Sequence, residues 1–324
     1  MEVFELDVWK NDWGLPSIDT DCLQVLAYAK IHNIPLKVNT SGNPFRTPNG
    51  RLPVLRCSDG TFDTVEDIIG YFRKKFKNST TETKLSQKQS TKFVAYSTMF
   101  KAKLFPALQF IWWIDKKNAD EFIRPWYCKA LPFPLNFYYP GKFERQARSM
   151  LEVMYPVEDD INVIENKVYS EAQQCLTLLS TMLGDSQYFS EDGPGALDAI
   201  IYSYLAPLLR GPLPNPALQN HLKACTNLVE YVLRITQKYF QNEYNNYEQL
   251  KAEDTAQKVR RDSESEYPNK RRNQILAGLF ASLAMVGYAF STGLVEVPLK
   301  ERGFSNDTSE YVLEDEDEDE EHVN

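Results

Sequence analysis

GRLPVLRCSDGTFDTVEDIIGYFRKK, residues 50–75, carries the strongest fold signal in the chain. Asp59-Gly60 separates two short apolar segments, which is typical of a β-hairpin. Pro53 stands at the entry to the first of these strands, where proline often marks a tight and sometimes cis turn. The segment from Thr64 to Lys75 is predicted to be helical, because Thr64 with Asp67 resembles a capping box and four apolar residues share one face: Val65, Ile68, Ile69 and Phe72.

The preceding residues supply a complementary unit. Residues 3–9 alternate between apolar and acidic side chains, which predicts a strand. Thr20 to Asn33 has helical spacing, with Asp19 in position to cap its start. Residues 35–39 form a second short apolar segment. We therefore expect a β-α-β unit followed by a β-β-α unit, together forming a thioredoxin-like domain over residues 1–76.

The rest of the body is predicted to be all-α. Residues 77–89 are polar and indicate a linker. The helical domain that follows spans residues 90–240, and its clearest helix runs from Ile161 to Leu183 before Gly184. Its other expected helices are 93–113, kinked by Pro106, 197–209 and 218–240. The fold class is therefore α/β plus all-α.

The composition and charge of the chain limit the classes of function that it can have. The chain has 324 residues, a hydrophobic fraction of 43% and a formal net charge of −9. Eight of the negative charges lie in the run from Glu314 to Glu321, so the remainder is close to neutral. No basic face indicates a nucleic-acid partner. Residues 298–324 are predicted to be an acidic, disordered tail, with a docking peptide for a basic partner as the alternative.

Cysteines and histidines give no pattern of a metal site. The five cysteines are widely spaced without a Cys-x-x-Cys pair, and we expect reduced, mostly buried thiols at Cys22, Cys57, Cys128, Cys175 and Cys225. None of the three histidines belongs to a Cys/His ligand pattern, so no metal is expected. The N-terminus resembles neither a signal peptide nor an Arg-rich transit peptide, so we expect any targeting signal to lie elsewhere in the chain.

A long uncharged run occupies residues 273–297. No charged residue occurs from Asn273 to Val295, a length of about 34 Å as a helix, and basic residues flank it. We therefore predict that residues 273–297 are a transmembrane anchor. Residues 241–272, which precede it, are predicted to be a charged linker or a loosely attached helix. Basic residues before the span place the body in the cytosol. The predicted anchor residues are Ile275, Leu276, Leu279, Phe280, Leu283, Met285, Val286, Tyr288 and Phe290.

Small residues recur in this run at helical spacing. Gly278 with Ser282 and Gly287 with Ser291 would let another membrane helix approach closely. The alternative is that small residues are simply common in spans.

The order of elements resembles the glutathione transferase architecture, and residues 63–72 and 188–205 look like two of its segments. The resemblance implies a glutathione-binding Glu/Gln-Ser pair, but Thr64-Val65 stands there, and valine has no hydroxyl. Ser17 and Cys22 are the nearby nucleophile candidates; neither has an adjacent histidine, and we interpret them as loop and packing residues. Asp198 fits the inner partner of a helix cap, with Gly195 at the capping position.

Four further segments resemble the metaxin family, and the similarity covers roughly residues 3–295. They are residues 13–19, 113–118, 126–137 and 171–179. The resemblance implies a mitochondrial outer-membrane protein with a cytosolic body. The partners implied are the β-barrel sorting and assembly machinery, its contact to the inner-membrane organising complex, and other metaxins. It implies no catalytic residue and no cofactor.

Three functions follow from these observations. The first is a non-enzymatic subunit of a mitochondrial import or β-barrel assembly complex. The others are a membrane-anchored glutathione-dependent enzyme, against which Val65 argues, and an adaptor linking mitochondria to cytosolic machinery. An aromatic stretch is a candidate partner-docking patch, although we favour packing beneath a loop for these residues: Trp126, Phe133, Phe137, Tyr138 and Tyr139.

Overall fold

The computed structural model describes residues 4–40, 43–76, 87–158, 160–190, 193–264 and 270–291. The chain divides into two compact units, Met1–Ala256 and Gln257–Asn324, and each is described by itself. Most of the predicted linker at 77–89 and the whole acidic tail at 298–324 lie outside the described residues.

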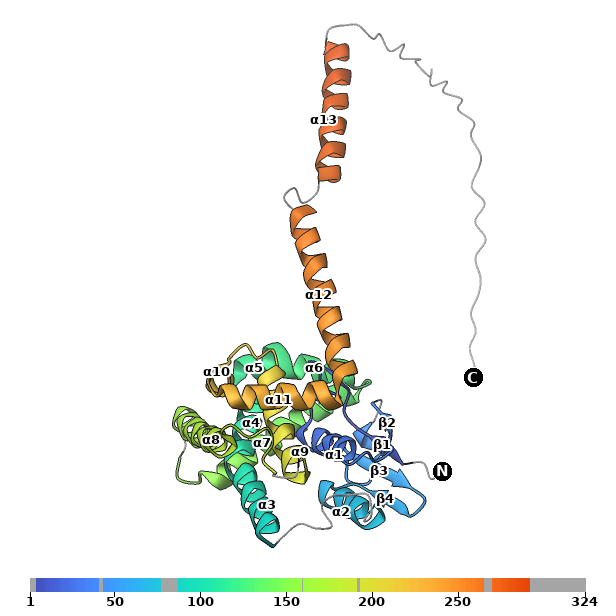
Figure 1. Cartoon of the computed structure of the whole chain (residues 1–324). Helices are drawn as coiled ribbons and strands as arrows, with labels where there is room; N and C mark the ends of the chain where they lie inside the picture. The colour runs from blue at the N-terminus through green and yellow to red at the C-terminus, as the bar shows by residue number, and fades with distance from the viewer. Residues whose placement is uncertain are drawn as a thin grey trace, which may run out of the picture. The chain divides into compact units, whose positions relative to one another are not determined.

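The first unit begins with a four-stranded sheet in the order β2-β1-β3-β4. β1 pairs in parallel with β2, and β3 pairs antiparallel with both β1 and β4. The elements are β1 (Glu5–Asp7), α1 (Thr20–Ile31), β2 (Lys37–Asn39), the 3-10 turn η1 (Pro44–Arg46), β3 (Val54–Cys57), β4 (Gly60–Phe62) and α2 (Val65–Lys75) (Figure 1). This is the β-α-β, β-β-α order that the sequence predicts.

The capping and turn residues predicted from the sequence take these roles at the ends of the elements. The Asp19 carboxylate accepts the Cys22 N–H at 2.9 Å and so caps α1. The Thr64 hydroxyl accepts the Asp67 N–H at 3.1 Å at the start of α2. The peptide bond before Pro53 is cis. The sequence signals at these positions therefore correspond to observed caps and turns.

The helical part of the first unit follows the sheet. Its elements are α3 (Gln87–Met99), the π-helical turn η3 (Phe100–Leu104), α4 (Phe105–Gln109), η4 (Phe110–Ile114), α5 (Lys116–Asn118), η5 (Ala119–Ile123), α6 (Arg124–Ala130), α7 (Leu135–Met154), α8 (Ile161–Leu183), α9 (Ala196–Arg210), α10 (Ala217–Ala224) and α11 (Thr226–Tyr239). Pro106 lies in the first turn of α4, so the expected kink is a break between elements.

The helix predicted over 218–240 is two helices. Cys225 lies between α10 and α11 with a ψ of 78°, outside the helical range, and its N–H donates to the Leu222 carbonyl. The prediction of one continuous helix over residues 218–240 was therefore wrong. The apolar spacing continues across the break, which is why the sequence does not reveal it.

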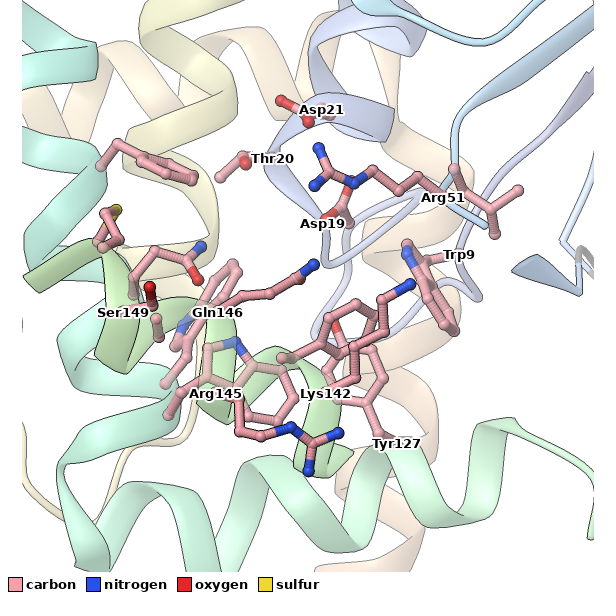
Figure 2. Close-up of a pocket in the computed structure, with 18 residues that line it drawn as sticks. Trp9, Asp19, Thr20, Asp21, Arg51, Tyr127, Lys142, Arg145, Gln146 and Ser149 are labelled. Carbon is pink, nitrogen blue, oxygen red and sulfur yellow. The ribbon is translucent and has the colours of Figure 1, made fainter. Parts of the chain in front are cut away.

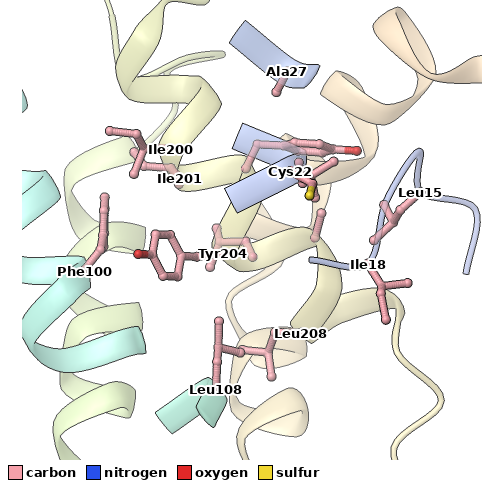
Figure 3. Packing of buried hydrophobic residues seen from close by; sticks show 14 of the residues in the cluster. Leu15, Ile18, Cys22, Ala27, Phe100, Leu108, Ile200, Ile201, Tyr204 and Leu208 are labelled. Atoms are coloured by element: carbon pink, nitrogen blue, oxygen red, sulfur yellow. The ribbon is translucent and has the colours of Figure 1, made fainter. Parts of the chain in front are cut away.

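Helix α9 joins the two halves of this unit into one core. Residues 196–208 are all buried, and α9 packs against α1. Figure 3 shows the Tyr204 ring of α9 pointing toward Phe100 of η3, and the centroids of the two rings lie 5.9 Å apart. Buried apolar surface of this kind supplies most of the stabilisation of a fold. The sheet domain and the helices are thus packed as one body.

A buried carboxylate holds the start of α9. Asp198 accepts the backbone N–H groups of Phe189 and Gly195 at 2.9 and 3.0 Å, and the Tyr231 hydroxyl at 3.2 Å. Asp198 therefore takes the inner capping role that the sequence predicts, even though Gly195 has no capping side chain.

Helix α12 (Gln241–Glu264) occupies much of the stretch predicted as a charged linker or loosely attached helix. Its first turns contact Arg210 at the end of α9. The guanidinium donates to the Trp13 carbonyl at 3.0 Å and to Glu248 at 2.6 Å, and it lies 4.7 Å from the ring centre of Tyr244 and 5.7 Å from that of Tyr247. The start of α12 is thus fixed to the loop after β1.

Helix α13 (Lys270–Ser291) covers most of the predicted anchor. Its large apolar side chains are exposed at Ile275, Leu276, Leu279, Phe280, Leu283, Met285, Val286 and Tyr288. Within the described residues, no helix has both the length and the apolar content needed to cross a membrane. The transmembrane helix predicted over 273–297 is therefore not supported. Residues 292–297 of the predicted anchor, and the side chain of Phe290, lie outside the described part.

Candidate ligand-binding cleft

Two adjoining cavities form a cleft between the sheet domain and the helices. Their volumes are about 580 Å³ and about 900 Å³. Both are lined by Asp21, Arg51, Leu52 and Phe105, so they share one boundary. Cavities of this size at a domain interface are typical of small-molecule sites.

The larger cavity contains Thr64 and Val65, which the sequence resemblance predicts to stand at the position of the glutathione-binding pair of transferases. It is lined by Pro53, Thr64 and Val65. The Thr64 hydroxyl is already engaged, because it accepts the Asp67 N–H and donates to the Asp67 carboxylate at 2.7 Å. Val65 is only 9% exposed and offers no hydrogen-bonding group. One cation that lines this cavity is already paired, because the Lys101 ammonium lies 2.7 Å from the Glu66 carboxylate.

The two nucleophile candidates from the sequence are fully buried and line neither cavity. Ser17 and Cys22 both have zero exposure. Burial raises the pKa of the Cys22 thiol well above its ordinary value, and the nearby Asp19 carboxylate adds to the rise. A thiol of this kind stays protonated and inert. Ser17 Oγ accepts the Asp19 N–H at 3.4 Å, which fits a role in the loop.

The smaller cavity has an aromatic wall. Trp9, Trp113, Tyr127 and Phe143 line it, and their rings pack edge-on or tilted, with centroids 5.0 Å apart for Trp9–Tyr127 and 5.3 Å for Trp113–Phe143. Trp112 also lines it and is 3% exposed, and its indole N–H has no acceptor in the described part of the chain. This wall offers apolar contact area and one unused donor.

Charged side chains from both sides of the cleft enter this cavity. Figure 2 shows Arg51 extending beside Asp19 and Asp21, with Lys142 extending from α7 toward the same group. A Cβ atom added to Gly50 would lie 3.5 Å from Lys142 Nζ, so the ammonium lies against the loop that carries Arg51. Arg145 lines the same cavity from the next turn of α7.

The two carboxylates are less acidic than usual. Burial raises the pKa of Asp19, although the hydrogen bonds from Cys22 oppose the rise. Enclosure by the cleft walls raises the pKa of Asp21, and the Asp19 and Glu66 charges add to it. Asp21 keeps an exposed surface, and the water there moderates the shift. Both effects reduce the negative charge that opposes the cations.

The aromatic stretch on the helical side divides into buried and exposed residues. Tyr139 is buried, and Trp126 is half-buried, with its indole N–H donated to Asp12 at 2.7 Å. Phe133, Phe137 and Tyr138 are 80%, 72% and 55% exposed, and the first two rings lie 6.2 Å apart. Packing beneath a loop therefore describes Trp126 and Tyr139, whereas the other three form a surface patch.

The cationic cavity has no short sequence motif. Arg51 comes from the loop before β3, whereas Lys142 and Arg145 come from α7, so only the fold brings them together. The one signal in the sequence is the spacing of Lys142, Arg145, Gln146 and Ser149, which places four polar residues on one face of a helix.

Comparison with known proteins shows which protein family this chain is similar to. The Tom37 family, described as "Outer mitochondrial membrane transport complex protein", matches residues 22–144. The chain is 40% identical to metaxin-1 of Bos taurus over 319 residues, covering 98% of both chains. The chain belongs to the metaxin family. Metaxin-1 of Mus musculus is 39% identical over 97% of this chain and 98% of the relative.

A metaxin-3, from Xenopus laevis, is 37% identical over 240 residues, which is 74% of this chain and 77% of the relative. The match with metaxin-1 of Bos taurus is longer and higher in identity than the match with this metaxin-3.

The fold is transferase-like and mostly helical, with one sheet. The glutathione S-transferase C-terminal domain family matches residues 172–235, from α8 to α11. Glutathione transferase F7 of Populus trichocarpa has a TM-score of 0.48, at 14% identity over 76% of this chain and 99% of that chain. The assignment rests on the element order and the family match rather than on this score.

Proposed function

We propose that this metaxin-family chain is a non-enzymatic subunit of an outer mitochondrial membrane transport complex, of the kind that sorts and assembles β-barrel proteins. Its body would face the cytosol and bind partner proteins, including other metaxins. The observation that carries the proposal is near full-length similarity to metaxins, together with the match to a family described as an outer mitochondrial membrane transport complex protein.

The cleft chemistry supports a binding role over a catalytic one. Thr64 and Val65 leave no free hydroxyl at the position where transferases bind the γ-glutamyl carboxylate. The nearest thiol, Cys22, has zero exposure and a raised pKa, so it cannot act as a nucleophile or activate one. A transferase-shaped body with this site is suited to recognition rather than conjugation.

The exposed aromatic patch supports a partner surface. Phe133, Phe137 and Tyr138 present apolar rings to solvent on the helical side. Aromatic side chains are enriched at protein interfaces, where they bury large areas with little loss of rotamer entropy. The patch is therefore the surface we expect partners of the complex to contact.

The test is purification of the tagged full-length chain from mitochondria, with quantitative identification of the proteins that accompany it. We expect components of the outer-membrane β-barrel assembly machinery and a second metaxin. Recovery of cytosolic motor or adaptor proteins without these components would favour the alternative of a mitochondrial adaptor.

A parallel glutathione titration by calorimetry tests the enzymatic alternative. Saturable binding together with conjugating activity would contradict the non-enzymatic role. A Val65→Ser variant provides the matched comparison, because it restores only a hydroxyl at the position where the pair binds glutathione.

A further inference from the structure

The smaller cavity has the properties of a ligand site that is separate from the partner surface. We propose that it binds a small organic anion, a molecule with a carboxylate or similar acidic group attached to an aromatic or aliphatic body. The inference goes beyond the proposed function and does not rest on it, because it concerns a small molecule inside the cleft.

The acidic end of such a ligand is matched by Arg51 and Lys142. Neither makes an ion pair with a carboxylate in the described residues. Neighbouring arginines behave differently, because Arg124 and Arg148 both pair with Glu144 of α7. Lys142 therefore keeps its charge available, and Arg51 lies beside Asp19 and Asp21 without forming an ion pair among the described residues.

The two cations converge from different elements. Lys142 lies over the Tyr139 ring, with Nζ 5.4 Å from its centre, and against the Gly50 backbone next to Arg51. A ligand carboxylate between them would receive two charge-assisted hydrogen bonds, which are about twice as strong as neutral ones. The position is fixed by packing on both sides, so little ordering is needed on binding.

The carboxylates in the cavity do not cancel this charge. The Asp19 carboxylate is already used to cap α1 through the Cys22 N–H. Asp21 is the other, and its side chain is exposed; burial raises the pKa of both carboxyls, although Arg51 opposes the rise at Asp21. With Arg145 at the same wall, cations outnumber carboxylates among the lining residues.

The body of the ligand is matched by the aromatic wall. Trp9, Trp113, Tyr127 and Phe143 enclose the side of the cavity away from solvent. The volume of about 580 Å³ suits a molecule of drug-like size rather than a folded segment of a protein. An aromatic body with one acidic group would use the wall and the cations at once.

The test is calorimetric titration of the full-length protein with phenylbutyrate and with phenylbutanol, its neutral counterpart. We expect the acid to bind at least about tenfold more tightly than the alcohol. An Arg51→Gln/Lys142→Gln variant should weaken binding of the acid at least about tenfold and leave that of the alcohol within about twofold. Tryptophan emission should saturate at the same concentration of the acid, since three of the five tryptophans line the cavity.

The matched control is Lys116→Gln/Lys117→Gln, which removes two exposed cations on α5 away from the cavity. It should bind both probes as the wild type does. A single Lys142→Gln variant keeps the test valid if the double variant does not fold. Equal affinity for acid and alcohol, absence of saturable binding of the acid, or equal losses in the cavity and control variants would each overturn the proposal.

Discussion

Replacing Arg210 with alanine should destabilise the body more than replacing any ordinary surface arginine. The guanidinium satisfies the Trp13 carbonyl, pairs with Glu248, and lies over the rings of Tyr244 and Tyr247, all with 16% side-chain exposure. Loss of a partner for a buried carbonyl costs about 1–3 kcal/mol. The half-exposed ion pair adds about 0.5–1 kcal/mol, and each ring contact about 0.5–1 kcal/mol.

These contributions share one side chain, so they do not add fully, and we expect a loss of about 3 kcal/mol in the free energy of unfolding. The assay is urea unfolding of the full-length chain, followed by circular dichroism and tryptophan emission. Arg234→Ala is the control: that half-buried arginine donates to the Gln187 carbonyl at 2.8 Å, and its loss should cost about 1 kcal/mol. The reasoning is refuted if the two variants lose the same stability.

Four further predictions concern single substitutions in the body. Gly14→Ala should destabilise by about 1–2 kcal/mol, because Gly14 has a φ of +75° and the added Cβ would lie 3.0 Å from Arg210 Nη2. Gly70→Ala, in helix α2 with open space around it, should be neutral or stabilising in the same unfolding assay. Burial raises the pKa of the Tyr202 hydroxyl, so the unfolded chain ionises first and stability should fall as the pH rises above about 10. The slope contributed by Tyr202 is about 1.4 kcal/mol per pH unit, and Tyr202→Phe should reduce the measured slope by that amount. Phe137→Ala should change stability by less than about 0.5 kcal/mol, since the ring is 72% exposed, yet lower the recovery of mitochondrial partners; full recovery would remove the patch from the account.

The sheet domain was predictable because its signals are local. Asp19 and Thr64 each satisfy a backbone N–H within three residues, and Pro53 fixes the entry to β3. Alternation in residues 3–9 leaves Leu6 and Val8 fully buried. Each of these features depends on residues that are close together in the sequence, so the sequence pattern is sufficient to predict it.

Other features depend on contacts between distant residues. The break at Cys225 has neither proline nor glycine to mark it, and the apolar spacing continues through it. The attachment of α12 depends on Arg210, which no pattern in residues 241–264 reveals. The cavity cations similarly come from a loop and from α7, and only the packing of α7 against the sheet domain brings them together.

The run at 273–297 was predicted to be a membrane span from its length and its lack of charge. Residues 273–291 form part of a helix, and the large apolar side chains described in it are exposed. Within the described residues, however, no helix has both the length and the apolar content of a membrane span. The Ser282 hydroxyl donates within the helix to the Gly278 carbonyl at 2.8 Å.

The most direct test of the central claim is the rate at which isolated mitochondria insert a radiolabelled β-barrel precursor into the outer membrane, with and without this chain. The account predicts that depletion slows insertion and that re-expression of the wild-type chain restores it. A Cys22→Ala variant, which removes the thiol and leaves the Thr64 cap intact, should restore insertion equally well, because the proposed role involves no conjugation chemistry. Unchanged insertion after depletion would contradict the proposed function.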